Sequence, residues 1–232
     1  MFSGIVLGTT KIKMLEPCLG YNTITLELAA EHCAALLVGA SVAIDGVCLT
    51  VTSINDNLVS FDIIDNSLTI TTLQSLVLGR EVNYERSLVE GGEIGGHILS
   101  GHIDYKTTVV TNPTADNGYC LTLAIPIEKQ KYWFSKGFVG INGCSLTVSD
   151  VDKELGQAII WLIPETIRQT NLGLLAIGGL VNIEIDRNTQ ILVDTVYDVI
   201  DEKFGALSET VQQLVDQSEL AGELVGRLKR TK

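Results

Sequence analysis

Short stretches in which apolar and polar residues alternate mark the first hundred residues of the chain. Residues 24–28 read Ile-Thr-Leu-Glu-Leu, and residues 41–53 and 58–64 are rich in Val, Ile, Thr and Phe. The turn-forming pair Asp-Gly at residues 45–46 and the run Asn-Asp-Asn at 55–57 separate these stretches. A period of two predicts half-buried β-strands, because successive side chains of a strand point to opposite faces. Short strands at regular spacing, without long helices between them, predict an all-β barrel or sandwich.

Two segments depart from this pattern. Residues 29–37 are rich in Ala, a strong helix former, and predict a short helix across one end of the first half. From Asp194 onward, apolar residues recur at helical spacing between Val196 and Phe204, with acidic residues among them. This spacing predicts an amphipathic helix that Asp194 caps, and such a helix needs an apolar partner, so we expect an oligomer contact there. Residues 207–232 are charged and polar between scattered leucines and indicate no function.

The chain contains an internal repeat at an offset of 97 residues. Residues 41–51, Ser-Val-Ala-Ile-Asp-Gly-Val-Cys-Leu-Thr-Val, align with residues 138–148, Phe-Val-Gly-Ile-Asn-Gly-Cys-Ser-Leu-Thr-Val. At the same offset Ser3-Gly4 meets Ser100-Gly101, and residues 24–28 meet residues 121–125. An offset of 99 then aligns Gly79, Val82, Asn83 and Glu85 with Gly178, Val181, Asn182 and Glu184. Because one register holds through four separated blocks, we predict two homologous halves.

Composition narrows the classes of function. A formal charge of −12 argues against nucleic acid and anionic membranes as partners, because phosphates attract clustered Lys and Arg. The chain has no run of about 18 apolar residues and no basic leader, so we expect neither a membrane span nor a signal peptide. Five cysteines without a Cys-x-x-Cys pair fit reduced thiols in a cytoplasmic protein. With three His in all, no metal site is expected.

The repeat places small polar side chains at matching positions after two tight turns. Cys48 and Thr50 follow one glycine turn, and Ser145 and Thr147 follow the other. A strand with such side chains can hydrogen-bond a planar heterocycle through its backbone and its hydroxyl groups. The alternative is that the threonines only favour strand formation, but the duplication favours a site.

The junction of the halves is rich in glycine and contains two histidines. Residues 91–102 lack the G-x-x-x-x-G-K pattern and the following helix of a phosphate loop, so we reject nucleotide binding. His97 and His102 are five residues apart in a strand-like stretch, which predicts opposite faces. His102 aligns with Ile5, and a histidine there could shuttle protons at neutral pH. A hydrogen-bonded structural histidine stays open as the alternative for His102 and is favoured for His97.

Acidic, amide and hydroxyl residues follow an apolar strand in each half. Asp65, Asn66 and Ser67 correspond to Pro164, Glu165 and Thr166 in the second half. Such groups suit recognition of a polar ring edge, although either stretch alone would be an ordinary loop. Outside this pattern, Lys136 could be a surface charge and Asp186 a turn residue.

Six blocks of the sequence together resemble the riboflavin synthase α-chain family. They are Met-Phe-Ser-Gly-Ile-Val at residues 1–6, Gly-Val-Cys-Leu-Thr-Val at 46–51, Gly-Gly-His-Ile-Leu-Ser-Gly-His at 95–102, Lys-Gly-Phe-Val-Gly-Ile-Asn-Gly-Cys-Ser-Leu-Thr at 136–147, Leu-Ile-Pro-Glu-Thr at 162–166 and Val-Asn-Ile-Glu-Ile-Asp at 181–186. Because the blocks span most of the chain in order, the match is far more specific than a single motif.

The resemblance implies an all-β fold of two homologous six-stranded Greek-key β-barrels in tandem plus a C-terminal α-helix. The lumazine-binding barrels would occupy residues 1–97 and 98–193, and residues 194–232 would form the helix and tail that associate in a homotrimer. The implied activity is a transferase reaction, the dismutation of two 6,7-dimethyl-8-ribityllumazine molecules by four-carbon transfer, without metal or cofactor. The products would be riboflavin and 5-amino-6-ribitylaminouracil. The resemblance does not decide whether lumazine synthase associates with this chain.

Site residues follow from the resemblance by matched position. The implied catalytic residues are His102, Cys48, Ser145, Thr147 and Asp186. The implied substrate-binding residues are Gly4, Ile5, Val6, Cys48, Leu49, Thr50, Asp62, Ile63, Ile64, Asp65, Asn66, Ser67, Gly101, His102, Ile103, Lys136, Ser145, Leu146, Thr147, Ile163, Pro164, Glu165, Thr166, Ile167 and Arg168. His102 and Cys48, with residues 62–67, would line the pocket of the first half. Ser145 and Thr147, with residues 4–6, residues 163–168 and Lys136 of a neighbouring subunit, would line the pocket of the second half. Deprotonation of the C7 methyl group of one lumazine would begin the reaction.

The chain departs from the family pattern at two positions. Asn142 stands where many members carry Asp, which puts any carboxylate role there in doubt, and Ser67 replaces the commoner Thr. The alternative functions are a non-catalytic lumazine or flavin carrier of the antenna type with the same fold, and an oligomeric structural module. Carriers tend to lose second-half site residues, whereas Ser145 and Thr147 remain here. A structural module would leave the paired polar loops unexplained.

Overall fold

The computed structural model describes residues 1–205, and the polar segment 207–232 lies outside the described residues. The chain divides into two compact units, residues 1–187 and residues 188–232. The first unit contains both halves of the repeat. The domain bounds expected from the resemblance, at residues 97 and 193, stay a prediction.

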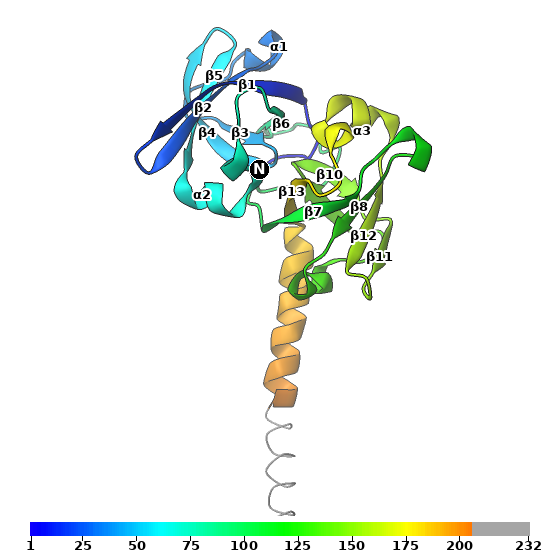
Figure 1. The fold of residues 1–232 in the computed structure, drawn as a ribbon. Coiled ribbons are helices and arrows are strands. Elements are labelled where there is room, and N and C mark those ends of the chain that lie inside the picture. The colour runs from blue at the N-terminus through cyan, green and yellow to red at the C-terminus, as the bar shows by residue number, and fades with distance from the viewer. Residues whose placement is uncertain (206–232) are drawn as a thin grey trace, which may run out of the picture. The chain divides into compact units, whose positions relative to one another are not determined.

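Six antiparallel strands of the first half close into a barrel (Figure 1). They are β1 (Gly8–Cys18), β2 (Tyr21–Glu27), β3 (Ser41–Ile44), β4 (Val47–Asn55), β5 (Leu58–Ile64) and β6 (Glu81–Arg86). The strands follow one another in the order β1-β2-β5-β4-β3-β6, and β6 pairs with β1 to close the ring. Alternating apolar side chains fill the interior, among them the fully buried Ile24, Leu26, Val59, Phe61 and Ile63. The predicted all-β fold of this half is confirmed.

The second half repeats the strand order of the first with one more strand. Its strands are β7 (Tyr105–Thr111), β8 (Cys120–Ala124), β9 (Phe138–Ile141), β10 (Cys144–Thr147), β11 (Asp150–Asp152), β12 (Gln157–Trp161) and β13 (Leu180–Ile185). They form a curled sheet in the order β10-β9-β13-β7-β8-β12-β11. By the repeat, β10 and β11 together correspond to β4. The tandem all-β architecture is therefore as predicted, but the second sheet has seven strands instead of six.

The extra strand arises at an irregularity that both halves share. In β4 the pairing with β5 shifts between Val51 and Ser53. The N–H of Val51 donates to the carbonyl of Ala40 at 2.9 Å, and its counterpart Val148 donates to Gly137 at 2.9 Å. In both halves the strand changes partners at this place. In the second half the change ends one strand and begins another.

Short helices connect the strands. They are α1 (Ala30–Cys33), α2 (Asp65–Ile70) and α3 (Pro164–Gln169), with the 3-10 helices η1 (Thr72–Ser75), η2 (Ala115–Asn117), η3 (Ile127–Tyr132) and η4 (Asn171–Leu174). The predicted helix at residues 29–37 was too long, because Arg86 donates to the carbonyls of His32 and Ala34 at 3.1 and 2.8 Å and ends the helix there. Ala35 follows with a positive φ of 56°.

The C-terminal helix begins earlier than its apolar spacing predicts. Residues 187–205 are helical, so Asp194 lies inside the helix and its predicted role as the N-cap is wrong. Asp186, which directly precedes the helix, is the residue type that favours this position. No helix within residues 1–205 is long and apolar enough to cross a membrane.

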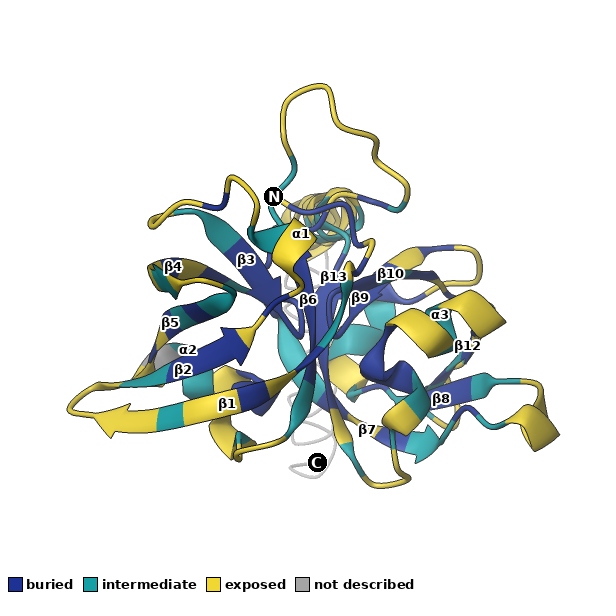
Figure 2. Cartoon of the chain, turned by 90° about the horizontal axis from the view of Figure 1, so that it is seen from above, coloured by how far each residue is buried: buried dark blue, intermediate teal, exposed yellow. Residues whose placement is uncertain are grey.

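A network of buried amide side chains joins the two halves. Buried residues gather along β6 and β13 (dark blue in Figure 2), which carry the corresponding residues Asn83 and Asn182. Asn83 donates to the carbonyl of Asn142 at 2.9 Å, and Asn182 donates to the carbonyl of Asp45 at 2.8 Å. The contacts are reciprocal, as expected for halves related by an approximate twofold axis. Buried amides with full hydrogen bonding fix one arrangement of two surfaces.

One side chain breaks the symmetry of this network. Asn171 stands where the first half has Thr72, and it donates to Asp45 Oδ1 at 2.8 Å. Its own oxygen accepts from Asn142 Nδ2 at 3.3 Å. Asn171 therefore needs an acceptor at residue 45 and a donor at residue 142. This pattern explains why the corresponding positions hold Asp45 and Asn142.

The two turns of the network approach each other closely. Asp45 and Gly46 have positive φ angles of 45° and 81°, and Asn142 and Gly143 have 46° and 79°. A Cβ atom on Gly46 would lie 2.7 Å from the backbone nitrogen of Gly143. Only glycine fits such a contact.

Candidate functional site

Two segments outside the strands cross between the halves. Phe2 and Leu99 pair as an isolated antiparallel bridge, with N–H···O distances of 2.8 and 3.0 Å. The segment that contains Gly4 reaches the second half, where its carbonyl accepts from the N–H of Ser145 at 2.8 Å. The segment that contains Gly101 reaches the first half, where its carbonyl accepts from the N–H of Cys48 at 2.8 Å. The strands β10 and β4 are therefore each contacted by a segment from the other half of the chain. We call this segment the wall of the site.

A cavity of about 280 Å³ lies at the crossing in the second half. It is lined by Gly4, Ile5, Val6, Cys144, Ser145, Ile163, Glu165, Thr166, Gln169 and Thr170. Seven of these residues were expected in one pocket from the resemblance, and Cys144, Gln169 and Thr170 were not. Five residues expected from the resemblance lie outside the lining of this cavity. They are Pro164, Ile167 and Arg168 on α3, and Leu146 and Thr147 on β10.

The hydroxyl of Ser145 is hydrogen-bonded to His97. Ser145 Oγ lies 2.6 Å from His97 Nδ1 and also accepts from the N–H of His97 at 3.1 Å. The imidazole is buried and stacks on Phe138, with ring centroids 5.3 Å apart. His97 Nε2 is buried and has no partner among residues 1–205. The sequence favoured a hydrogen-bonded structural role for His97. The structure shows the hydrogen bond, with a candidate catalytic side chain as the partner, and the role of His97 stays a prediction.

Burial sets the protonation state of this pair. Burial lowers the pKa of His97, and the negative charge of Asp186 acts in the opposite direction. The lowered pKa favours the neutral ring at neutral pH. In the tautomer with the proton on Nε2, Ser145 Oγ–H donates to Nδ1, so a proton taken up by the hydroxyl can pass to the imidazole. The arrangement can therefore move a proton at the cavity wall.

The first half repeats the backbone of this site with different side chains. Cys48, in place of Ser145, is half-buried on β4, and Thr50 is exposed on the same side of the strand. His102, in place of Ile5, is exposed, and its carbonyl accepts from Arg187 at 3.0 Å. Leu49 lies between Cys48 and Thr50 and is buried in the barrel core. The candidate site is therefore on the outer face of the barrel.

Other predicted residues of the first half divide between the core and the surface. Ile63 and Ile103 are buried in the barrel core. Ile64 is 59% exposed, as is its counterpart Ile163 at 63%, so both apolar side chains are available at the strand ends. Asp62 is exposed and accepts from Thr23 at 2.7 Å.

The helices after these strands are also equivalent. The predicted residues 65–67 begin α2, and residues 164–168 lie in α3. Thr71 donates to the carbonyl of Ser67, and Thr170 donates to the carbonyl of Thr166, each at 2.6 Å. Hydrogen bonds from Arg168 and Gln169 lower the pKa of the exposed Glu165, which favours its charged form.

Lys136 is exposed and lies outside the cavity lining of its own chain. It has a positive φ of 69°, and its N–H donates to the carbonyl of Val148 at 2.8 Å. The turn holds this side chain on the surface before β9. A contact with a ligand of another subunit stays a prediction.

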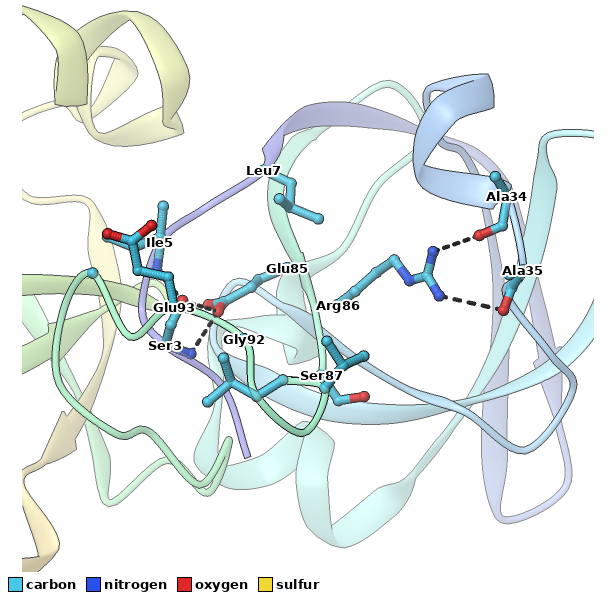
Figure 3. A pocket seen from close by; sticks show the side chains of 13 residues that line it. Ser3, Ile5, Leu7, Ala34, Ala35, Glu85, Arg86, Ser87, Gly92 and Glu93 are labelled. Atoms are coloured by element: carbon cyan, nitrogen blue, oxygen red, sulfur yellow. Dashed lines mark hydrogen bonds between the residues drawn. The ribbon is translucent and has the colours of Figure 1, made fainter.

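Ile5 also lines a larger cavity of about 760 Å³ (Figure 3). It is lined mainly by Ser3, Leu7, Glu85, Arg86 and the loop at residues 87–95. Of the predicted site residues, Ile5 alone lines it. We expect the chemistry in the smaller cavity, because it is lined by Ser145, whose hydroxyl is hydrogen-bonded to His97.

Within residues 1–205, no group of His, Cys, Asp and Glu side chains could hold a metal ion. The groups that the two candidate sites present are hydroxyl, thiol, imidazole and carboxylate.

Comparison with known proteins identifies the repeat and the family. The lumazine binding domain matches the chain twice, at residues 3–87 and 100–186. The riboflavin synthase of Escherichia coli is 42% identical over 210 residues, which cover 90% of this chain and 98% of that protein. The riboflavin synthase of Chlamydia pneumoniae is 39% identical over 84% of this chain and 95% of its own length. The chain belongs to the riboflavin synthase family.

Solved structures of the protein LumP have a similar fold. LumP in complex with riboflavin superposes with a TM-score of 0.73 and 28% identity, covering 81% of this chain and all of LumP. LumP in complex with 6,7-dimethyl-8-(1'-D-ribityl) lumazine gives a TM-score of 0.71 and 27% identity. The chain is therefore similar in sequence to riboflavin synthases, and similar in fold to LumP, whose structures contain riboflavin and 6,7-dimethyl-8-(1'-D-ribityl) lumazine.

Proposed function

We propose that the chain catalyses the dismutation of two 6,7-dimethyl-8-ribityllumazine molecules to riboflavin and 5-amino-6-ribitylaminouracil. One lumazine donates a four-carbon unit to the other, so each half of the chain binds one molecule. The observation that carries the proposal is a duplicated backbone site with unlike side chains. Gly4 contacts Ser145 and Gly101 contacts Cys48 in the same way, yet only the second half has a serine–histidine pair among the described residues.

Equivalent backbones suit two identical substrates, and unlike side chains suit two different roles. Cys48 and His102 would face one lumazine, and Ser145, with Thr147, would face the other. Deprotonation of the C7 methyl group would give a stabilised carbanion, with Ser145 and His97 or the exposed His102 accepting the proton. Asp186 would oppose the fall in the pKa of His97. Holding two rings in register removes much of the entropic barrier of a bimolecular reaction.

The proposal includes an oligomeric state, a cellular location and a protein partner. The C-terminal helix at residues 187–205 carries exposed apolar side chains, including Val196, Val199 and Phe204. Such a helix supports a homotrimer in which Lys136 reaches the second-half lumazine of a neighbouring subunit. Reduced thiols support a cytoplasmic location. Lumazine synthase is a further candidate partner.

A lumazine or flavin carrier is the second candidate, because LumP shares the fold and its structures contain riboflavin and the lumazine. The presence of Ser145 with His97 favours the enzyme, since binding alone needs no buried proton acceptor beside the cavity.

Incubation of the purified protein with 6,7-dimethyl-8-ribityllumazine tests the proposal. We expect lumazine to be consumed with formation of one riboflavin and one 5-amino-6-ribitylaminouracil for every two lumazines, measured by absorbance and chromatography. The control is the same incubation with heat-denatured protein. Binding without conversion would favour the carrier, and neither binding nor conversion would favour a structural module.

A further inference from the structure

Two buried carboxylates lie behind the segments that cross between the halves. Glu85 is on β6 and Glu184 is on β13, with exposed fractions of 4% and 2%. The two are equivalent in the repeat. Neither was among the candidate site residues, and the proposed reaction uses neither. A buried carboxylate is costly unless its oxygens accept hydrogen bonds, so its partners indicate its role.

Each carboxylate binds three donors of one crossing segment. Glu85 Oε1 accepts from the N–H and Oγ–H of Ser3 at 2.6 and 2.8 Å (Figure 3). Glu85 Oε2 accepts from the N–H of Gly4 at 3.1 Å. Glu184 accepts from the same groups of Ser100 at 2.6 and 2.6 Å, and from the N–H of Gly101 at 3.1 Å. The serine hydroxyls then accept from the N–H two residues on, at 3.3 and 3.2 Å. The segment therefore folds around the carboxylate.

The opposite side of each segment meets a site residue of the other half. A Cβ on Gly4 would lie 2.4 Å from Ser145 Cβ, and a Cβ on Gly101 would lie 2.5 Å from Cys48 Cβ. Any movement of a segment therefore changes its contact with the site strand. Glu85 belongs to the first half and Ser145 to the second, so the connection crosses the molecule.

We propose that Glu85 and Glu184 are positioning residues that act across the halves: Glu85 sets the wall of the second-half site, and Glu184 sets the wall of the first-half site. Each site is then built from a strand of its own half and a segment anchored by a carboxylate of the other half. A change in one half alters the geometry of the site in the other.

A carboxylate fits this role better than its amide. Burial raises the pKa of Glu85, and hydrogen bonds from Ser3 and Gly4 oppose that rise. A carboxylate has only acceptors and can satisfy all three donors, whereas Gln presents an NH₂ group to at least one of them. The substitution therefore leaves a buried N–H without an acceptor and loosens the segment.

Cysteines adjacent to each site allow a direct test on the unliganded protein. Cys48 reports on the first-half site, and Cys144, which lines the second-half cavity, reports on the other. The probe is iodoacetamide, with the alkylation rate of each cysteine measured by peptide mass spectrometry. We expect Glu184→Gln to raise the rate at Cys48 about tenfold and Glu85→Gln to raise the rate at Cys144 about tenfold. Cys33 and Cys120 should keep their wild-type rates.

Charge alone requires a control at Cys144. Burial raises the pKa of Cys144 to about 12, with a smaller contribution from the charge of Glu85. Glu85→Gln removes that charge and favours the reactive thiolate by a second route. Glu85→Asp keeps the charge but withdraws the carboxylate by one methylene. It should therefore raise the rate at Cys144 if position matters, and leave the rate unchanged if only charge matters.

The kinetic consequence rests on the proposed function. With 6,7-dimethyl-8-ribityllumazine as substrate, each Gln variant should raise KM about tenfold and lower kcat by less, because the wall binds substrate and takes no proton. The alkylation result does not depend on turnover, so a failure of the proposed reaction leaves it intact. Equal acceleration at all cysteines, acceleration only within the half that carries the substitution, or wild-type rates throughout would each overturn the proposal.

Discussion

Replacing Ser145 by Ala lowers kcat for riboflavin formation about 100-fold or more, while the dissociation constant of the lumazine changes little. The hydroxyl is the polar group at the cavity wall that contacts the buried imidazole of His97, at 2.6 Å. Alanine keeps the strand and the cavity, but it removes the group through which a proton reaches the ring. Stopped-flow absorbance and equilibrium titration with 6,7-dimethyl-8-ribityllumazine measure the two quantities.

His97→Ala should cause a similar loss, because the two side chains act as one unit. The double variant should then be scarcely slower than either single variant, as expected when residues share one function. His102→Ala, at the first-half site, provides a contrast. Its loss should multiply with that of Ser145→Ala, because the two residues serve separate sites.

The control is Ser149→Ala, a substitution of the same kind four residues along the chain. Ser149 Oγ accepts from the N–H of Trp161 at 3.3 Å and lies outside the cavity lining. Its kcat should equal that of the wild type. If Ser145→Ala retains full kcat, or if it loses affinity in proportion to rate, the serine is a binding group and the proton transfer lies elsewhere.

The strands could be predicted because their signals are local. Alternation at residues 24–28 and 58–64 depends on which side chains face the barrel interior. Burial follows it closely at residues 58–64, whereas at residues 24–28 the polar Thr25 is buried as well. The repeat added what local pattern lacks, since it showed that the second half copies the first. The start of the C-terminal helix at residue 187 was missed because the exposed apolar stripe begins later than the helical backbone does.

The candidate site was only partly predictable for a different reason. The resemblance to the family, and not the repeat itself, grouped Gly4 with Ser145 and His102 with Cys48. In the structure Gly4 contacts Ser145, and Gly101, which precedes His102, contacts Cys48. The partner of Ser145 was missed, because His97 lies in an irregular segment that was expected to be strand-like. A strand would have placed the two histidines on opposite faces. The crossing of residues 97–103 places them in different halves, and no local pattern encodes a crossing between distant segments.

The interface between the halves shows the same limit at residue 142. From the sequence, Asn142 was a departure that weakened a carboxylate role. In the structure it is the partner of Asn171, whose amide already donates to Asp45. The orientation of the Asn171 amide therefore explains why the network has a carboxylate at Asp45 and an amide at Asn142.

This arrangement predicts that Asn142→Asp destabilises the protein strongly at neutral pH and only weakly in acid. Asn142 is 2% exposed, and an ionised carboxylate there would lie in the same buried network as Asp45. It would also face the oxygen of Asn171, which now accepts from Nδ2. A protonated carboxyl group at this position can still donate to that oxygen, so the neutral form of the variant keeps the network intact.

The sign and size follow from the existing carboxylate. Burial raises the pKa of Asp45 from 3.8 to about 6, although hydrogen bonds from Asn83 and Asn171 and the charge of Arg80 oppose the rise. The new carboxylate has a like-charged neighbour in addition, so its folded pKa should be at least as high. A raised folded pKa gives stability that is present below the unfolded pKa and is lost as pH rises toward the folded pKa. At about 1.4 kcal/mol for each pKa unit, the variant should lose about 3 kcal/mol or more of unfolding free energy between about pH 4 and pH 7 relative to wild type.

Urea unfolding from about pH 4 to pH 8, followed by circular dichroism, measures this difference. The matched control is Asp45→Asn, which removes the buried carboxylate and should therefore gain stability relative to wild type as pH rises over the same range. Opposite slopes for the two variants are expected because one adds a raised pKa and the other removes it. A penalty for Asn142→Asp that is the same at both ends of this pH range would show that steric strain, and not the buried charge, determines the residue at this position.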